Sequence, residues 1–308
     1  MRIVIIGQAA FGQSVLEALV KNGEEVAGVF CPPDREGRPH DPIKTAALEK
    51  GVPVLQFKRM RDREAIGAFK NLMPDLCVMA FVTDIVPMDM LRAPSKGTIQ
   101  YHPSLLPKHR GPSSINWPII QGETKTGLTI FWPDEGLDTG PILLQKEVAI
   151  GPDDTLGSLY FDKLFPLGVQ GMVEAVELVR KGKAPKREQD HSQATYEGWC
   201  KAEQAVIDWS KPLADVYNLV RGCDPSPGAN TTLDGKRVSF YSAERITGGA
   251  GPDVSGGHVA EVMGDGFRVA AMGGSIVVRR VQPEGGKKMP AGEWAASAAL
   301  KPGMRFGS

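Results

Sequence analysis

Two residues in the middle of the chain have the types and settings of an acid–base pair. His102 opens a turn bracketed by prolines, residues 102–107 (HPSLLP), and Asp138 lies about one helix and one strand later in the acidic loop 132–140. A histidine titrates near neutral pH and can serve as general acid, general base or oxyanion donor. An aspartate facing it would favour the protonated ring and hold one tautomer.

Each of these residues also has a purely structural interpretation. His102 could be satisfied by backbone groups, and the Asp-Thr-Gly sequence at 138–140 suits a turn. Chemistry is favoured because His102 directly follows a predicted buried strand, residues 97–101, and is fixed by Pro103. Gln100 lies on the same side of that strand, since side chains alternate with a period of two, and it could donate a hydrogen bond to a carbonyl oxygen. The alternative for Gln100 is a polar cap on the strand end.

The other candidate groups are weaker. His109 and Arg110 lie in a basic run, residues 108–111, for which a solvated loop is favoured over an anion contact. The remaining histidines fall in predicted loops and receive no role: His40, His191 and His258. The sequence has no serine nucleophile elbow, HExxH motif or P-loop.

The first 30 residues predict the fold class. A short apolar run at 3–6, helical spacing over 11–22 and a second apolar run at 26–30 form a βαβ opening, which is typical of an α/β fold with a doubly wound, mostly parallel sheet (Rossmann-like). The turn at 7–12 reads GQAAFG and lacks GxGxxG, so dinucleotide binding is not expected.

Three predicted strand ends converge on one edge of this sheet. They are residues 81–85 after strand 76–81, residues 100–104 after strand 97–101, and residues 132–138 after strand 127–132. Ligands of open α/β sheets bind at the carboxyl ends of the strands. A helix over 113–121, a return strand over 143–149 and a long amphipathic helix over 155–181 complete the domain.

A second domain is predicted beyond a polar, aperiodic stretch at 181–194. Short strands recur every 8–12 residues between glycine-rich turns, which indicates a small β-barrel or sandwich, OB-like in size. These strands are 236–243, 257–262, 266–271 and 274–281. The expected division is a catalytic domain at 1–185, a linker at 186–202 and a small barrel at 203–308.

Composition narrows the class of protein. The 308 residues are 42% hydrophobic, enough for a proper core, and 36 basic residues balance 36 acidic ones. Zero net charge argues mildly against binding nucleic acid mainly by charge. Four scattered cysteines predict reduced thiols and no metal site. No signal peptide and no long apolar run is found, so a soluble, cytoplasmic protein is expected.

Beyond single residues, the chain resembles the formyltransferases that use 10-formyltetrahydrofolate. It is similar to methionyl-tRNA formyltransferase and, more closely, to the N-terminal hydrolase domain of 10-formyltetrahydrofolate dehydrogenase. The motifs that carry the resemblance are residues 6–8 (IGQ), 101–107 (YHPSLLP), 114–117 (SINW), 129–132 (TIFW), 137–140 (LDTG), 164–166 (LFP), 195–196 (TY), 207–209 (IDW) and 301–303 (KPG). Since no aldehyde dehydrogenase domain follows, a free-standing relative is expected.

The resemblance implies a folate cleft under the strand ends, with 10-formyltetrahydrofolate as co-substrate and no metal. His102 and Asp138 match the catalytic pair. The residues that match the folate-lining walls are Phe81, Val82, Thr83, Ile85, Trp132 and Asp134. Two features depart from the family: Gln100 stands where asparagine is usual, and the loop 33–44 is shorter than the tRNA-reading loop and lacks its lysines.

The expected function is removal of the formyl group from 10-formyltetrahydrofolate and its transfer to an acceptor. The acceptor stays open between the amine of methionyl-tRNA and a small amine. One alternative is a hydrolase with water as acceptor, and another is a non-catalytic folate-binding module, which Gln100 leaves possible. Oligomeric state is not predicted.

Overall fold

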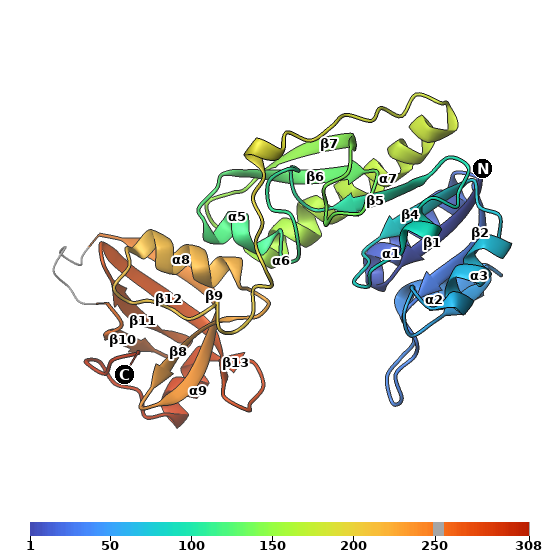
Figure 1. Ribbon diagram of the computed structural model, residues 1–308. Helices are drawn as coiled ribbons and strands as arrows, with labels where there is room; N and C mark the ends of the chain where they lie inside the picture. Colours follow the sequence, from blue (N-terminus) through green and yellow to red (C-terminus); the bar gives the residue numbers. More distant parts are fainter. Residues whose placement is uncertain (249–255, 308) are drawn as a thin grey trace. The chain divides into compact units, whose positions relative to one another are not determined.

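The computed structural model describes residues 1–248 and 256–307, which form two compact units. The first unit comprises residues 1–111, 127–148 and 162–196, and the second comprises residues 112–126, 149–161 and 197–308. Each is a sheet with its own hydrophobic core (Figure 1). Among the described helices, none is both long and apolar enough to cross a membrane.

The first sheet has seven strands in the order β3-β2-β1-β4-β5-β6-β7. Its strands are β1 (Arg2–Gly7), β2 (Glu25–Cys31), β3 (Val54–Gln56), β4 (Leu76–Ala80), β5 (Thr98–His102), β6 (Lys125–Phe131) and β7 (Ile142–Ala149). The pairs from β3 through β5 are parallel, and β6 runs antiparallel to β5. The predicted Rossmann-like, mostly parallel sheet is therefore confirmed.

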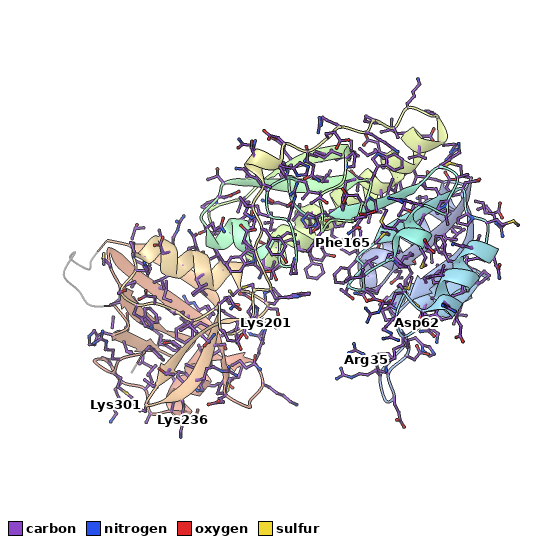
Figure 2. All side chains as sticks on the ribbon, viewed as in Figure 1. Arg35, Asp62, Phe165, Lys201, Lys236 and Lys301 are labelled. Carbon is purple, nitrogen blue, oxygen red and sulfur yellow. The ribbon has the colours of Figure 1, made fainter. Side chains whose placement is uncertain are left out.

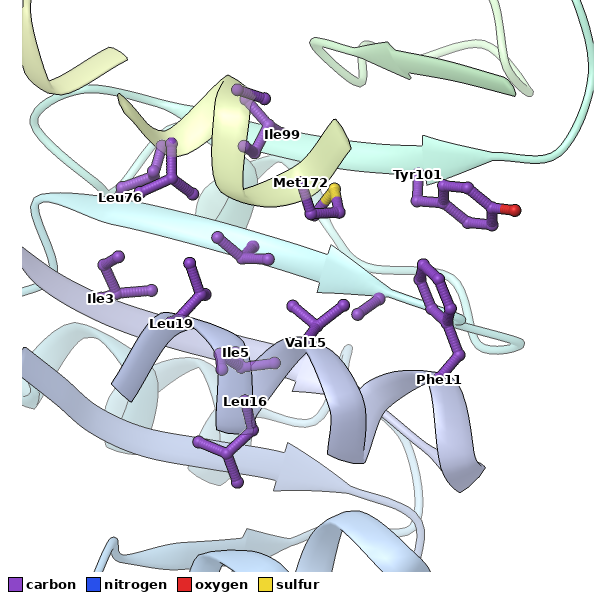
Figure 3. Close-up of a cluster of buried hydrophobic side chains, with 14 of the residues drawn as sticks. Ile3, Ile5, Phe11, Val15, Leu16, Leu19, Leu76, Ile99, Tyr101 and Met172 are labelled. Atoms are coloured by element: carbon purple, nitrogen blue, oxygen red, sulfur yellow. The ribbon is translucent and has the colours of Figure 1, made fainter. Parts of the chain in front are cut away.

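Helices cover this sheet on both faces. They are α1 (Ala9–Lys21), α2 (Pro42–Glu49), α3 (Arg63–Asn71), α4 (Met88–Leu91) and α7 (Phe165–Arg180), with a short 3-10 turn η2 (His191–Gln193). Side chains alternate along β1 between two hydrophobic clusters, one on each face of the sheet. Ile3 and Ile5 pack in the cluster with α1 and α7 (Figure 3), whereas Val4 and Ile6 pack in the cluster with Phe69 of α3. A strand buried on both faces reads as a continuous apolar run, which is why these strands were visible in the sequence.

Gly7 and the start of α1 are closed to a nucleotide. A Cβ on Gly7 would lie 2.6 Å from the Ala80 carbonyl oxygen, so glycine is required for close packing of β1 against β4. The Asp41 carboxylate accepts the Ala9 N–H at 2.8 Å and so occupies the helix N-terminus, where a phosphate would bind.

The predicted helix over 155–181 is interrupted. It consists of α6 (Leu156–Ser158), a π-helical stretch η1 (Leu159–Leu164) and α7. Thr155 and Ser158 form a reciprocal capping box at its start. Pro166, in the first turn of α7, has no N–H to donate to an upstream carbonyl, so the regular α-helical ladder cannot run through it.

The second unit contains a six-stranded antiparallel sheet, as expected from its short, regularly spaced strands. Its elements are α5 (Asn116–Ile120), α8 (Leu213–Gly222), β8 (Ala229–Leu233), β9 (Lys236–Thr247), β10 (Val259–Met263), β11 (Gly266–Ala271), β12 (Gly274–Pro283), β13 (Met289–Pro290) and α9 (Ala291–Ser297). Five strands follow the order β10-β11-β12-β9-β8, and β13 pairs with β12. Lys236 and Lys301 belong to this unit, and Arg35 lies on the loop between β2 and α2 of the first (Figure 2).

All four cysteines are buried and free. Burial raises the pKa of the Cys31 thiol to about 11 and also raises the pKa of Cys77. Both thiols therefore stay protonated near neutral pH, which makes them core residues and not nucleophiles.

Candidate active site

The alternation of side chains along β5 places two polar residues on one face of the first sheet. Ile99 and Tyr101 enter the core shared with α1 and α7, so the alternate residues Gln100 and His102 lie on the opposite face. Gln100 pairs with Met79 of the parallel strand β4 and with Phe131 of the antiparallel strand β6. The sequence analysis predicted this juxtaposition from the strand period alone.

His102 is the last residue of β5 and is buried, with 6% of its surface exposed. Its Nε2 lies 2.8 Å from the carbonyl oxygen of His109, which can only accept, so Nε2 carries a proton. Its Nδ1 lies 3.6 Å from Asp138 Oδ2. The structure thus brings together the predicted pair, and only the imidazolium form presents an N–H to both neighbours.

Asp138 is held in an uncommon backbone conformation. Its φ is +57°, in the left-handed region that aspartate tolerates better than most residues, and 6% of its surface is exposed. Its Oδ2 accepts the Gly111 N–H at 2.8 Å. Gly140 must be glycine, because a Cβ there would lie 1.8 Å from the Trp132 carbonyl oxygen. The carboxylate therefore faces His102 from a tightly constrained loop.

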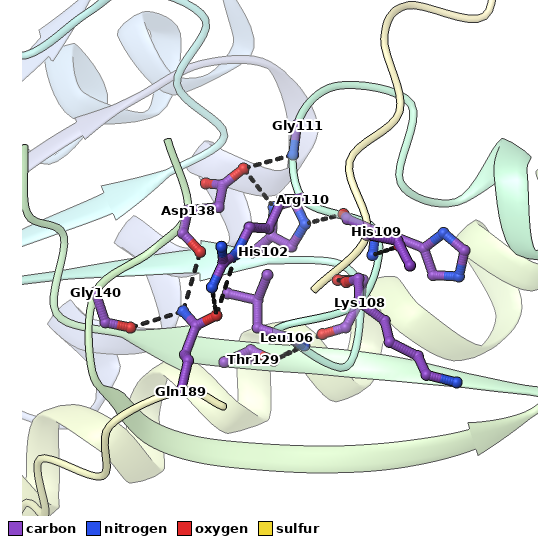
Figure 4. A network of polar contacts seen from close by, with 12 residues as sticks. His102, Leu106, Lys108, His109, Arg110, Gly111, Thr129, Asp138, Gly140 and Gln189 are labelled. Carbon is purple, nitrogen blue, oxygen red and sulfur yellow. Dashed lines mark hydrogen bonds and ion pairs between the residues drawn. The ribbon is translucent and has the colours of Figure 1, made fainter. Parts of the chain in front are cut away.

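A buried polar network lies behind Asp138 (Figure 4). Gln189, 4% exposed, donates from Nε2 to the carbonyl oxygens of Asp138 at 2.9 Å and Gly140 at 2.7 Å. Its Oε1 accepts from Arg110 Nη2 at 2.7 Å and from Nε at 3.3 Å. Arg110 is buried, as is His109, so the preference for a solvated loop at 108–111 was wrong for both residues. The Arg110 guanidinium donates hydrogen bonds within the protein and does not face solvent.

The sequence analysis missed Gln189 altogether. This residue falls in the stretch 181–194, which was interpreted as a linker because it is polar and aperiodic. Between residues 181 and 199 of the described chain, Gln189 is the one buried side chain. Its partners lie 49 to 79 residues away, so no local pattern could have identified it.

The turn after His102 is fixed from beneath by Thr129. Its hydroxyl donates to the Ser104 carbonyl oxygen at 2.7 Å and accepts the Leu106 N–H at 3.1 Å. The Gln145 amide adds bonds to the Leu106 carbonyl oxygen at 2.7 Å and to the Thr129 hydroxyl at 3.0 Å. His102 is therefore carried by a rigid turn.

Gln100 remains available for a ligand. Its side chain is half-buried and, within the described part of the chain, forms no hydrogen bond to protein. A half-buried amide without a partner is costly unless water or a ligand satisfies it. Gln100 is therefore suited to bind a group presented to the His102 face.

The loop after β4 presents apolar surface beside this face. Phe81 has a φ of +62° and is 47% exposed, and Ile85 is 79% exposed. Val82 is half-buried, and the Thr83 hydroxyl accepts from Gln8 Nε2 at 3.2 Å. Asp84 accepts the backbone N–H groups of Met60 and Ile85, so it fixes the loop. Two large apolar side chains held out on a fixed loop suit a flat aromatic ligand.

Trp132 and Asp134 are placed differently from the other predicted folate residues. The Trp132 ring is 9% exposed, packs in the core, and donates from Nε1 to the Pro185 carbonyl oxygen at 2.9 Å. Asp134 is exposed, and its Oδ1 accepts from Gly136 N and from the Thr139 hydroxyl. Trp132 therefore supports the loop 132–140 from below, and Asp134 shapes its turn.

Two family models match the chain. One described as formyl transferase covers residues 1–176, and one described as formyl transferase, C-terminal domain, covers residues 200–299. The methionyl-tRNA formyltransferase of Geobacter sulfurreducens is 38% identical over 312 residues, with 100% of this chain and 97% of that protein covered.

Longer relatives also match. The cytosolic 10-formyltetrahydrofolate dehydrogenase of Mus musculus is 43% identical over 319 residues, covering 98% of this chain and 35% of that protein. The chain thus spans about a third of the length of such relatives.

Solved structures share the fold at lower identity. HypX from Aquifex aeolicus, in complex with tetrahydrofolic acid, gives a TM-score of 0.72 at 19% identity over 98% of this chain and 48% of that one. An N-formyltransferase from Helicobacter canadensis, in complex with folinic acid and dTDP-3-aminofucose, gives a TM-score of 0.68 at 17% identity. The match covers 91% of this chain and 99% of that one.

Proposed function

This chain belongs to the formyl transferase family, and we propose that it removes the formyl group of 10-formyltetrahydrofolate and passes it to an acceptor. The observation that carries the proposal is the buried His102–Asp138 pair at the carboxyl end of β5, with the unpartnered Gln100 amide on the same face. The names of relatives support it, since they include a 10-formyltetrahydrofolate dehydrogenase and a methionyl-tRNA formyltransferase.

The folate would lie on the loop after β4. Exposed Phe81 and Ile85 offer apolar contact to a pteridine ring, and the backbone at Val82 and Thr83 offers donors and acceptors to its edges. On the other side, the loop 132–140 would form the second wall, supported by the Trp132 ring and shaped by Asp134. A folate complex of HypX supports this use of the fold.

The chemical step begins with attack of an amine or water on the formyl carbon. The developing oxyanion would accept hydrogen bonds from the Gln100 amide and from His102 as imidazolium. Nε2 is engaged by the His109 carbonyl oxygen, so Nδ1, which is beyond hydrogen-bond length from Asp138, is the nitrogen that can meet the oxyanion. Donors aimed at the developing charge stabilise the transition state more than the ground state.

Asp138 would accept the proton of the nucleophile and return it to the leaving group. Its Oδ2 is engaged by the Gly111 N–H, which leaves Oδ1 to accept a proton from the attacking nucleophile, directly or through water. Collapse of the tetrahedral intermediate breaks the bond between carbon and N10, and N10 takes up that proton. Tetrahydrofolate and the formylated acceptor, or formate when water attacks, are the products.

Water is the acceptor that a second observation favours, which would make the protein a 10-formyltetrahydrofolate hydrolase. Binding of methionyl-tRNA needs a basic face, and basic residues of the second unit could supply one. There, Arg279 pairs with Glu244 and Asp265, and Arg245 lies 3.6 Å from Asp153. These two arginines already have carboxylate partners, so they contribute less to phosphate binding than unpaired cations would.

The test measures release of tetrahydrofolate from 10-formyltetrahydrofolate under three conditions: protein alone, with charged initiator methionyl-tRNA, and with small amines. Release by the protein alone supports the hydrolase. Release that requires tRNA or an amine supports the transferase. Tight folate binding without release under any condition would contradict both and support the binding module.

A further inference from the structure

The segment 187–195, here called the strap, contacts both residues that flank the His102 ring. It pairs with β7 through Arg187 and Ile142, whose backbone groups exchange two hydrogen bonds of 2.7 and 3.0 Å. From this anchor it runs behind the site and ends at Thr195. We infer that the strap is a positioning element of the active site, acting through Gln189 and Thr195; the inference rests on the proposed function.

On the Asp138 side, Gln189 holds the backbone. Its amide bonds the carbonyl oxygens of Asp138 and Gly140, on both sides of Thr139. Two donors from one rigid amide fix the orientation of the peptide units around Asp138. That is how a non-glycine residue keeps a φ of +57°.

On the opposite side, Thr195 holds His109. The Thr195 hydroxyl accepts the His109 N–H at 2.8 Å, and the Thr195 carbonyl oxygen accepts the Arg110 N–H at 3.0 Å. His109 has a φ of +55°, also left-handed, and this conformation turns its carbonyl oxygen toward His102 (Figure 4).

Arg110 joins the two sides. Its guanidinium donates to Gln189 Oε1 and to His191 Nδ1 at 2.9 Å, so three strap residues contact this one arginine. A guanidinium has no acceptor, so His191 must present a lone pair at Nδ1. The result is a closed network in which Gln189 and Thr195 cannot shift independently.

Both contacts to the His102 ring therefore come from strained residues that the strap secures. Left-handed conformations cost energy at non-glycine positions and persist only where surrounding contacts enforce them. Without those contacts, Asp138 and the His109 carbonyl would relax and the ring would lose its orientation. Among the described residues, the loop after β4 has no hydrogen bond to the strap, whereas the second folate wall, loop 132–140, is bonded by Gln189. Loss of the strap contacts should therefore lower turnover more than folate affinity.

The kinetic test uses two pairs of variants. Gln189→Leu removes the donors, with exposed Gln193→Ala as its matched control on the same segment. Thr195→Val removes the hydroxyl, with Thr195→Ser as the conservative variant that keeps it. We expect kcat to fall by about 10²-fold in Gln189→Leu and Thr195→Val. The folate Kd should change less than about threefold in Thr195→Val, and by a smaller factor than kcat in Gln189→Leu, which also loosens loop 132–140. Both control variants should keep wild-type kcat.

A second readout does not depend on turnover. The ¹⁵N chemical shifts of the His102 ring report its protonation and hydrogen bonds, and they should change in Gln189→Leu in the same direction as in Asp138→Asn. A wild-type protein that releases no tetrahydrofolate would contradict the proposed function while leaving this comparison decisive. Should Gln189→Leu fail to fold, the Thr195 pair gives the same comparison. Wild-type kcat together with unchanged ring shifts in both strap variants would overturn the inference.

Discussion

At the scale of single residues, the candidate site depends on two residues whose backbone is strained. Asp138 and His109 both adopt left-handed conformations, and each places one oxygen against the His102 ring. Strain of this kind is retained where geometry is over-determined by neighbouring contacts. Here the gain is a histidine ring whose Nε2 is held by a hydrogen bond and whose Nδ1 faces a carboxylate before any ligand arrives.

The first prediction concerns the acid–base pair. Asp138→Asn should lower turnover of 10-formyltetrahydrofolate by at least about 10²-fold, because the amide cannot accept the proton. Asparagine also tolerates the left-handed region and can still accept the Gly111 N–H, so folding and folate affinity should persist. In His102→Ala, turnover should fall by at least the same factor. Initial-rate assays give kcat, and titration calorimetry gives the folate Kd.

The matched control for that prediction is Asp89→Asn, an exposed carboxylate in α4. It should behave as wild type. Near-wild-type turnover in well-folded Asp138→Asn would remove this aspartate from the mechanism.

A second prediction concerns Gln100. Gln100→Leu keeps the approximate shape but removes the donor, so kcat should fall by about 10²-fold if the amide stabilises the oxyanion. Gln100→Asn keeps a donor of shorter reach and should lose less. An unchanged kcat for Gln100→Leu would show that this position only fills space on the strand.

The sequence pointed to His102, Asp138 and Gln100 as candidates because each stands at a predicted strand end or in a distinctive loop. Arg110 and Gln189 could not be found that way. Their burial results from contacts between segments about 80 residues apart. The neighbours of Gln189 in sequence are exposed, and Arg110 lies in a run of basic residues that is typical of a solvated loop. Local patterns indicate burial only where it is periodic.

At the scale of elements, strands with apolar sequences were predictable and those with polar sequences were not. β11 (Gly266–Ala271) was predicted to the residue, because its alternating apolar side chains pack in the core. β8 (Ala229–Leu233) was missed, since its sequence, ANTTL, is short and polar. The π-helical stretch before α7 was also invisible, because helical periodicity continues across it.

Two glycine substitutions test the packing of these elements. Gly7→Ala should destabilise the protein by about 1–3 kcal/mol, because its Cβ would lie 2.6 Å from a backbone oxygen that cannot yield. Gly67→Ala, in the exposed middle of α3 with nothing within 4 Å of a Cβ, should stabilise it by about 0.5–1 kcal/mol. Urea denaturation gives both values. Equal effects at the two positions would contradict the packing described for β1 and β4.

At the scale of the whole molecule, the two compact units are not consecutive in sequence. Residues 112–126 and 149–161 leave the first unit and belong to the second. Within the second unit, the buried Asn116 amide donates to the carbonyl oxygens of Gly222 at 2.8 Å and Ser226 at 3.2 Å. Arg221 donates to those of Gly151 and Asp154. The sequence-based boundary at 186–202 remains a prediction that a fragment can test.

The last prediction is that residues 1–196 will not behave as a self-sufficient domain. In that fragment, α5 loses the partners of Asn116 and the core against which Trp117 and Ile120 pack, which exposes an unsatisfied amide and apolar surface. Hydrogen exchange should show protection at 116–120 reduced by at least about 10-fold relative to the full chain, while β1 and β4 stay protected. Exposed α5 should also favour association of the fragment at micromolar concentration. A monomeric fragment with full protection at 116–120 would instead place an independent domain boundary after the strap.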